Sequence, residues 1–241
     1  MMIQEYTALE TIDLLLRDRA KILATTQAAG DRDVMPMLRT MVATIAICMA
    51  IVGAALGTYR GGAQIGYAAI KLPLVLLGTA ALSAPALTAI GLALGRRARF
   101  AHDLALVLSA LAFGALLLAA CTPLILLGRS IDLDYHRMIL ATVGMFAIAG
   151  IAALRMIAVG LAGEHAVGWR AAFTGLCIVF VVVGGQLSWA LRPYLVRPRA
   201  QDVPFVREVE GSLFDSVTQA FDSARGIYTR GEAPLPSRSA P

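Results

Sequence analysis

Charged residues are scarce in this chain. They make up 15% of 241 residues, and lysine is almost absent, since Lys21 and Lys71 are its only examples. A soluble domain carries about 25% charged residues, so the chain lacks the polar side chains that would cover a surface facing water. Hydrophobic residues account for 58% of the chain, and its mean hydropathy is +0.72. The composition therefore predicts an integral membrane protein.

Cysteine is rare, and catalytic motifs and basic stripes are missing. Cys48, Cys121 and Cys177 are odd in number and lie inside apolar runs, which argues against a disulfide framework or a metal site. The chain contains no nucleophile elbow, phosphate loop or zinc motif, so we expect no cofactor and no enzymatic activity. The net charge is +5, but the arginines stand at the ends of apolar runs rather than among aromatics. This pattern predicts lipid contact and no nucleic acid.

Long apolar runs dominate what remains. Five of them can each form a helix that crosses the roughly 30 Å of a bilayer's hydrocarbon core, at residues 40–58, 71–95, 104–128, 138–163 and 171–191. The links between them are short, which predicts antiparallel neighbours. Pro73, Pro85 and Pro123 should kink or start helices. The expected fold is all-α, a polytopic membrane bundle of five or six helices over residues 39–195.

An amphipathic arm is expected on each side of the bundle. The first arm covers residues 1–38 and contains an expected helix over 7–29. A capping box of Thr7 and Glu10 and an ion pair of Asp13 and Arg17 support this helix. We expect it to pack on protein rather than lie flat on the bilayer. In the second, residues 196–230, a short helix over 212–225 is expected, followed by a disordered tail over 231–241.

Arginine placement favours a cytoplasmic N-terminus in a bacterial inner membrane. The link after the second run carries Arg96, Arg97 and Arg99, and basic links stay on the cytoplasmic side. Five crossings would then put the basic C-terminal tail outside, against the same rule. Either the tail crosses regardless, or one segment is re-entrant, and the fifth is the best candidate because Gly184, Gly185 and Gln186 interrupt it.

Small residues recur at helical spacing and predict close helix packing. Glycines that stand four apart let two backbones approach in lipid, and this spacing joins Gly53, Gly57 and Gly61, and also Gly91 and Gly95.

Few polar groups lie at membrane depth, where such groups are candidates for function. Lys71 stands at the head of the second run, Arg155 lies within the fourth and Gln186 within the fifth. For Lys71 and Arg155 we favour a side chain that reaches the headgroups over an ion or substrate site. Asp132, Asp134 and His136 share one link and could hold a metal or move a proton, but a polar turn is the favoured interpretation.

One run near the end of the last span resembles a known pattern. The residues Gly185-Gln186-Leu-Ser-Trp189-Ala-Leu-Arg192-Pro193, with GTYRGGAQ at 57–64 and Lys71-Leu-Pro73, resemble a family of bacterial polytopic membrane proteins with no established activity. The resemblance implies a membrane role and no reaction. A looser similarity in span number, and in the arm before the membrane, is to Yip-type proteins of membrane organisation. Read physically, Trp189 is an interfacial anchor and Arg192 a phosphate or carboxylate contact.

Three functions remain open from the sequence. The leading hypothesis is a non-enzymatic anchor or scaffold whose arms contact other protein subunits or a second copy of the chain. The alternative is a channel or carrier for a small solute or ion, with Lys71 or Gln186 facing its path. A membrane enzyme that uses Asp132, Asp134 and His136 is a third, weaker hypothesis.

Overall fold

Long apolar helices make up most of the structure, a computed structural model that describes residues 7–28, 30, 34–133, 135–163, 168–191 and 205. Over these residues the chain is helical and contains no strand, as predicted. The helices are α1 (Ala8–Arg17), α2 (Arg19–Ala28), α3 (Met35–Gly57), α4 (Ala63–Ala93), α5 (Phe100–Ala120), α6 (Thr122–Ser130), α7 (Tyr135–Ala162) and α8 (Trp169–Ala190). All belong to one unit of the chain, Met1–Arg207.

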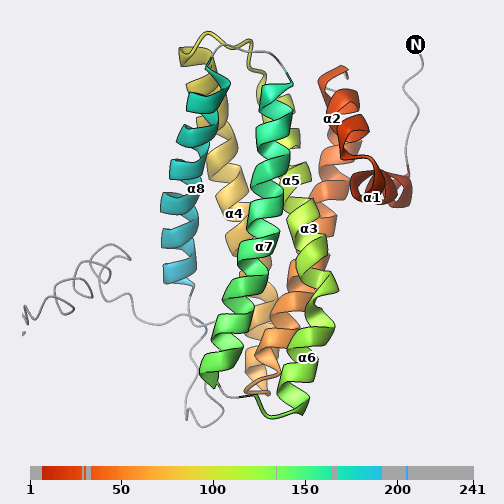
Figure 1. The fold of residues 1–241 in the computed structure, drawn as a ribbon, viewed down its shortest axis with the longest axis vertical. Helices are drawn as coiled ribbons and strands as arrows, with labels where there is room; N and C mark the ends of the chain where they lie inside the picture. The colour runs from red at the N-terminus through yellow and green to blue at the C-terminus, as the bar shows by residue number, and fades with distance from the viewer. Residues whose placement is uncertain are drawn as a thin grey trace, which may run out of the picture. The chain divides into compact units, whose positions relative to one another are not determined.

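Five stretches of the described chain are long and apolar enough to cross a membrane: α3, α4, α5 continued by α6, α7 and α8. The chain is therefore an integral membrane protein. Short links join successive stretches, so each runs opposite to the one before (Figure 1). We call the end where α3, α5 and α8 begin the arm end, and the end where α4 and α7 begin the far end.

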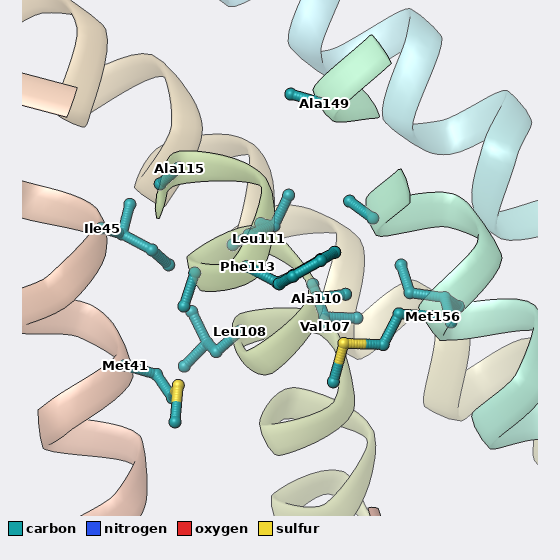
Figure 2. Packing of buried hydrophobic residues seen from close by; sticks show 14 of the residues in the cluster. Met41, Ile45, Val107, Leu108, Ala110, Leu111, Phe113, Ala115, Ala149 and Met156 are labelled. Atoms are coloured by element: carbon teal, nitrogen blue, oxygen red, sulfur yellow. The ribbon is translucent and has the colours of Figure 1, made fainter. Parts of the chain in front are cut away.

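Helix α5 is the centre of the bundle. Every residue from Ala105 to Ala115 is buried, and α5 contacts α3, α4 and α7. Figure 2 shows Met41 and Ile45 of α3 on one side of α5 and Met156 of α7 on the other. Helix α8 is peripheral, since it packs mainly on α4 and only Ala172 and Leu176 are buried along its length.

The helices differ from the expected spans at three places. Helix α4 begins at Ala63, earlier than expected, and continues through Pro73 and Pro85. The third span breaks at Cys121, because Pro123 has no backbone N–H to extend the ladder and instead sits in the first turn of α6. Helix α8 runs unbroken through Gly184, so the interruption considered for the fifth segment is absent.

The N-terminal arm contains two helices where one was expected. Thr7 and Glu10 form the predicted capping box at the start of α1, and the predicted pair of Arg17 and Asp13 has an N–O distance of 2.7 Å. The helix ends at Asp18, whose carboxylate accepts a hydrogen bond from the Lys21 N–H (3.0 Å) and so caps α2. The arm packs on α3, α5 and α7, with α1 lying crosswise to the long helices (Figure 1).

The second arm cannot be compared with its prediction. The helix expected over 212–225 and the tail expected over 231–241 lie outside the described residues, as does Arg192. After α8, the structure describes Leu191 and Phe205.

Candidate functional site

Two groups of buried polar side chains lie toward the two ends of the bundle. Arg96, Asp103 and Thr88 meet near the arm end, where α4 passes into α5. Gln64 and Lys71 are fully buried toward the far end, in the first turns of α4. Polar groups at such positions are costly unless they are paired, so each needs a physical explanation.

The turn after α4 aims Arg96 back at the bundle. Gly95 adopts φ +77°, and the N–H groups of Arg96 and Gly95 donate to the carbonyls of Gly91 (2.9 Å) and Leu92 (3.0 Å). This is a Schellman cap, which glycine favours because it needs a left-handed residue. A Cβ on Gly91 would lie 3.2 Å from Nε of Arg96, so the glycine leaves room for the guanidinium.

Asp103, in the first turn of α5, receives that guanidinium. Its carboxylate forms an ion pair with Arg96, and its other oxygen accepts a hydrogen bond from the Thr88 hydroxyl at 2.8 Å. The side chains of Arg96 and Asp103 are 4% and 3% exposed. Breaking such a buried pair by removing one partner costs about 3–5 kcal/mol. The cluster therefore joins the end of α4 to the start of α5.

This cluster was not predicted from the sequence. Arg96 was interpreted only as part of a basic link that sets the topology, and no ion pair with Asp103 was expected. Two features of the sequence could have predicted the pair. Gly95, after a long apolar run, marks the end of a helix, and Asp103 follows Arg96 by seven residues, in the next helix.

Lys71 differs from its expectation. Because α4 begins at Ala63, Lys71 lies about 12 Å into the helix at 1.5 Å per residue. Its side chain is fully buried. Its ammonium Nζ lies 5.0 Å from the centroid of the Phe205 ring, within cation–π range.

Phe205 also contacts Tyr67, one turn before Lys71. The two rings meet edge to face with centroids 5.2 Å apart and planes at 84°, a favourable aromatic geometry. Phe205 thus connects the chain beyond α8 to the beginning of α4. This contact was not predicted, because it joins positions more than a hundred residues apart in the sequence.

The links at the far end are held to each other. The Tyr59 hydroxyl donates to the Leu133 carbonyl, and Nη1 of Arg129 donates to the Tyr59 carbonyl at 2.8 Å. These bonds join the α3–α4 link to the end of α6 and the residues after it. They fix the far end as the Arg96 cluster fixes the arm end.

The acidic link is only partly described. Asp132 is exposed and has a positive φ of 50°, and Asp134 and the side chain of His136 lie outside the described residues. Among the residues that were described, no group of three metal-ligating side chains occurs.

The remaining candidates lie on α7 and α8. Arg155 is exposed on α7, while Gln186 and Trp189 are partly buried on the last turns of α8.

Two of the five packing glycines stand at a helix crossing. A Cβ on Gly53 would lie 2.2 Å from the Ala68 carbonyl oxygen, and one on Gly57 would lie 2.6 Å from that of Gln64. The backbones of α3 and α4 therefore touch at this crossing. Gly61 and Gly95 have positive φ in turns and nothing within 4 Å of a built Cβ, and Gly91 faces Arg96 and Ala98 rather than another helix.

No family model, no curated protein and no solved structure matches this chain. The resemblance of the Gly185–Pro193 run to a bacterial membrane family stays a prediction.

Proposed function

We propose that this chain is a non-enzymatic anchor or scaffold subunit of the bacterial inner membrane, which presents its N-terminal arm to other protein subunits. The observation that carries the proposal is the way this arm is fixed. Leu15 and Ile22 are 0% and 1% exposed against the bundle, while Asp13 and Arg17, on the opposite side of α1, are 59% and 80% exposed.

The interior of the bundle supports an anchor. The buried stretch of α5 from Ala105 to Ala115 carries one polar side chain, Ser109, and is otherwise apolar. Its neighbours contribute Met41, Ile45 and Met156, which are also buried (Figure 2). A core packed in this way holds helices in fixed positions. That rigidity suits a scaffold better than a conduit.

The charges at the two ends support a cytoplasmic arm end. Four exposed arginines surround it, namely Arg39, Arg97, Arg99 and Arg170. At the far end, Arg129 and Arg137 are exposed and Arg60 is partly buried. Positive charge is retained on the cytoplasmic side of a membrane. Although Arg96 is neutralised by Asp103, the arm end keeps the excess among the residues that the structure describes.

The mass of the protein assembly extracted in a mild detergent tests the scaffold proposal. Light scattering should give the extracted wild type a mass well above the 25.4 kDa of one chain. In the double variant Asp13→Arg/Arg17→Asp, the i,i+4 pair is kept but the charge pattern is reversed, so we expect the assembly to be lost. Arg137→Glu at the far end is the matched control and should leave the mass unchanged. A monomeric wild type would contradict the proposal.

A channel or carrier is the second candidate, and one observation favours it. Lys71 is a fully buried cation inside a membrane-spanning helix, and buried ionisable groups at depth often mark solute paths. Flux of a small anion into proteoliposomes should then disappear in Lys71→Ala and persist in Lys21→Ala, since Lys21 is exposed on α2. Equal flux in both variants and in empty liposomes would exclude this candidate for that anion.

A further inference from the structure

We propose that α1 is an interfacial helix: Leu9 and Leu16 insert into the lipid of one leaflet beside the bundle, while the charged edge of α1 stays among the headgroups. This inference does not depend on the proposed function. It assigns a lipid surface, rather than a protein, to one particular side of α1.

The surface of α1 is divided into three sectors. Thr11 and Leu15 are buried against the bundle. Leu9 and Leu16, seven residues apart and therefore on one face, are 79% and 46% exposed. At about 100° per residue, Ile12 lies between this exposed face and Leu15, and Ile12 is half-buried. The bundle thus leaves part of the apolar surface of α1 uncovered.

The charged sector lies on the remaining side of α1. Asp13 and Arg17 form an exposed pair, and Glu10 is exposed next to them. Around the helix axis, the side chains that contact the bundle come first, the exposed leucines follow, and the charged side chains come last. A helix that lies in the plane of a membrane surface has this order when one flank also rests on a protein.

Two contacts of α2 set the level of α1 along the bundle. The Arg19 guanidinium, one residue after the junction of α1 and α2, lies 4.5 Å from the centroid of the Phe113 ring. Phe113 is about 20 Å along α5 from its start at Phe100, at 1.5 Å per residue. Further along α2, a methyl of Leu23 lies 3.4 Å from the position of a Cβ built on Gly160, near the arm end of α7.

The bundle is longer than the hydrocarbon core, so one of its ends must project. The stretch Phe100–Ser130 has 31 residues, which is about 46 Å of helix against a core of about 30 Å. At the α6 end, Leu124, Leu126 and Leu127 are 60%, 43% and 56% exposed, which suits lipid. At the arm end the exposed side chains include Arg39, Arg97 and Arg99, which suit headgroups and water. The hydrocarbon core therefore extends from the α6 end, and the arm end projects.

This placement gives α1 the depth of an interfacial helix. If the hydrocarbon core of the bilayer begins at the level of Gly128 and is about 30 Å thick, its other boundary lies near Leu108, toward the arm end. Phe113 then lies about 8 Å below the hydrocarbon boundary, within the 5–10 Å to which the apolar face of an interfacial helix is buried. The same placement puts the Arg96–Asp103 pair at headgroup level, and leaves Lys71 well inside the core, where protein covers it.

Spin-label accessibility in reconstituted vesicles tests the proposal. Single cysteines would replace Leu9, Leu16, Asp13 and Arg17 in turn, in the full chain with Cys48, Cys121 and Cys177 changed to alanine. Each labelled protein is placed in vesicles of phosphatidylcholine and phosphatidylglycerol. Collision rates are then measured with oxygen, which concentrates in lipid, and with a water-soluble nickel chelate.

The ratio of oxygen to nickel collisions should be several-fold higher at positions 9 and 16 than at 13 and 17. A label at Ile148, which is 69% exposed on α7, provides the value for a fully lipid-facing site. Equal ratios at all four α1 positions would overturn the proposal, because α1 would then lie in water. Positions 9 and 16 shielded from both reagents would also overturn it, because protein would then cover them.

A second variant guards against a local effect of the label. The double variant Leu9→Ser/Leu16→Ser should raise the rate of collisions between the nickel chelate and a label at position 13, because α1 no longer inserts apolar side chains into the lipid. The combination Ala8→Ser with Ala24→Ser changes exposed positions outside the leucine face and should leave the label unchanged. An unchanged label in both variants would contradict insertion of the leucines.

Discussion

Arg96 and Asp103 form an ion pair that bridges two successive membrane helices, with their side chains 4% and 3% exposed. Neither residue lies in the middle of its helix. One follows the glycine that ends α4, and the other lies in the first turn of α5. Their pairing closes the arm end of the bundle, and it explains why a link rich in arginine contributes a guanidinium to the interior.

Removing one partner of this pair should be strongly destabilising. Asp103→Ala leaves the Arg96 guanidinium without its carboxylate, and we expect a loss of about 3–5 kcal/mol in the free energy of unfolding. Arg96→Met combined with Asp103→Leu removes both charges and should recover most of that loss, since apolar replacement of a buried pair is often neutral. Thermal unfolding in detergent measures both. A double variant no more stable than Asp103→Ala would show that the pair is not the cause.

The α3–α4 crossing should not tolerate a methyl group. Gly53→Ala places a Cβ 2.2 Å from a backbone oxygen of α4, so the helices must separate, at a cost of about 1–3 kcal/mol. The control is Gly66→Ala on α4, where a built Cβ meets nothing within 4 Å. That variant should be neutral or more stable by up to about 1 kcal/mol. Equal melting temperatures for the two variants would contradict the observed crossing.

Two buried hydroxyls should respond in opposite directions. The Ser109 hydroxyl is buried without a hydrogen-bond partner among the described residues, so Ser109→Ala removes an unsatisfied group and should leave stability unchanged or raise it. The Thr79 hydroxyl donates to the Val75 carbonyl at 2.7 Å, so Thr79→Val should cost about 1 kcal/mol. The comparison is a pair of thermal unfolding curves. If the Ser109→Ala variant unfolded at a lower temperature than the Thr79→Val variant, this prediction would be wrong.

The start of α1 should fray in acid. The backbone N–H and the hydroxyl of Thr7 hold the pKa of Glu10 below its usual value. A depressed folded-state pKa means that the capping box stabilises α1 at neutral pH and is lost as pH falls through that pKa. A spin label at Ala8 should therefore gain mobility as the pH falls below the ordinary pKa of a glutamate. The variant Glu10→Gln should show much less change with pH, and an identical titration in both would rule out this cap as the cause.

Much of the fold could be predicted from the sequence because apolar length is a strong signal in a membrane protein. The five spanning stretches were located to within a few residues at most of their ends. The capping box at Thr7 and the Asp13–Arg17 pair were also foreseen, since both are local patterns within one helix. The break at Asp18 was not foreseen, because one polar residue within an amphipathic pattern does not reveal that its side chain caps a second helix.

The buried polar groups were harder to predict. The pairing of Arg96 with Asp103 depends on the direction in which the chain leaves the turn at Gly95. That direction cannot be predicted from the composition of the link. The burial of Lys71 depends on where α4 begins and on Phe205, which is remote in the sequence. Gly184 was expected to interrupt α8, but it lies against Thr79 of α4, so the glycine serves helix packing instead.

The placement of the two ends of the bundle on opposite sides of the membrane is tested most directly by cysteine labelling on intact cells. Single cysteines at Ala24 on α2 and at Ser130 at the end of α6, both exposed, would be placed in a background that lacks the three native cysteines. A reagent that does not cross membranes should label position 130 and leave position 24 unlabelled until the cells are opened. Labelling of both positions, or protection of both, in intact cells would place the two ends of the bundle on one side and contradict the arrangement of crossings described above.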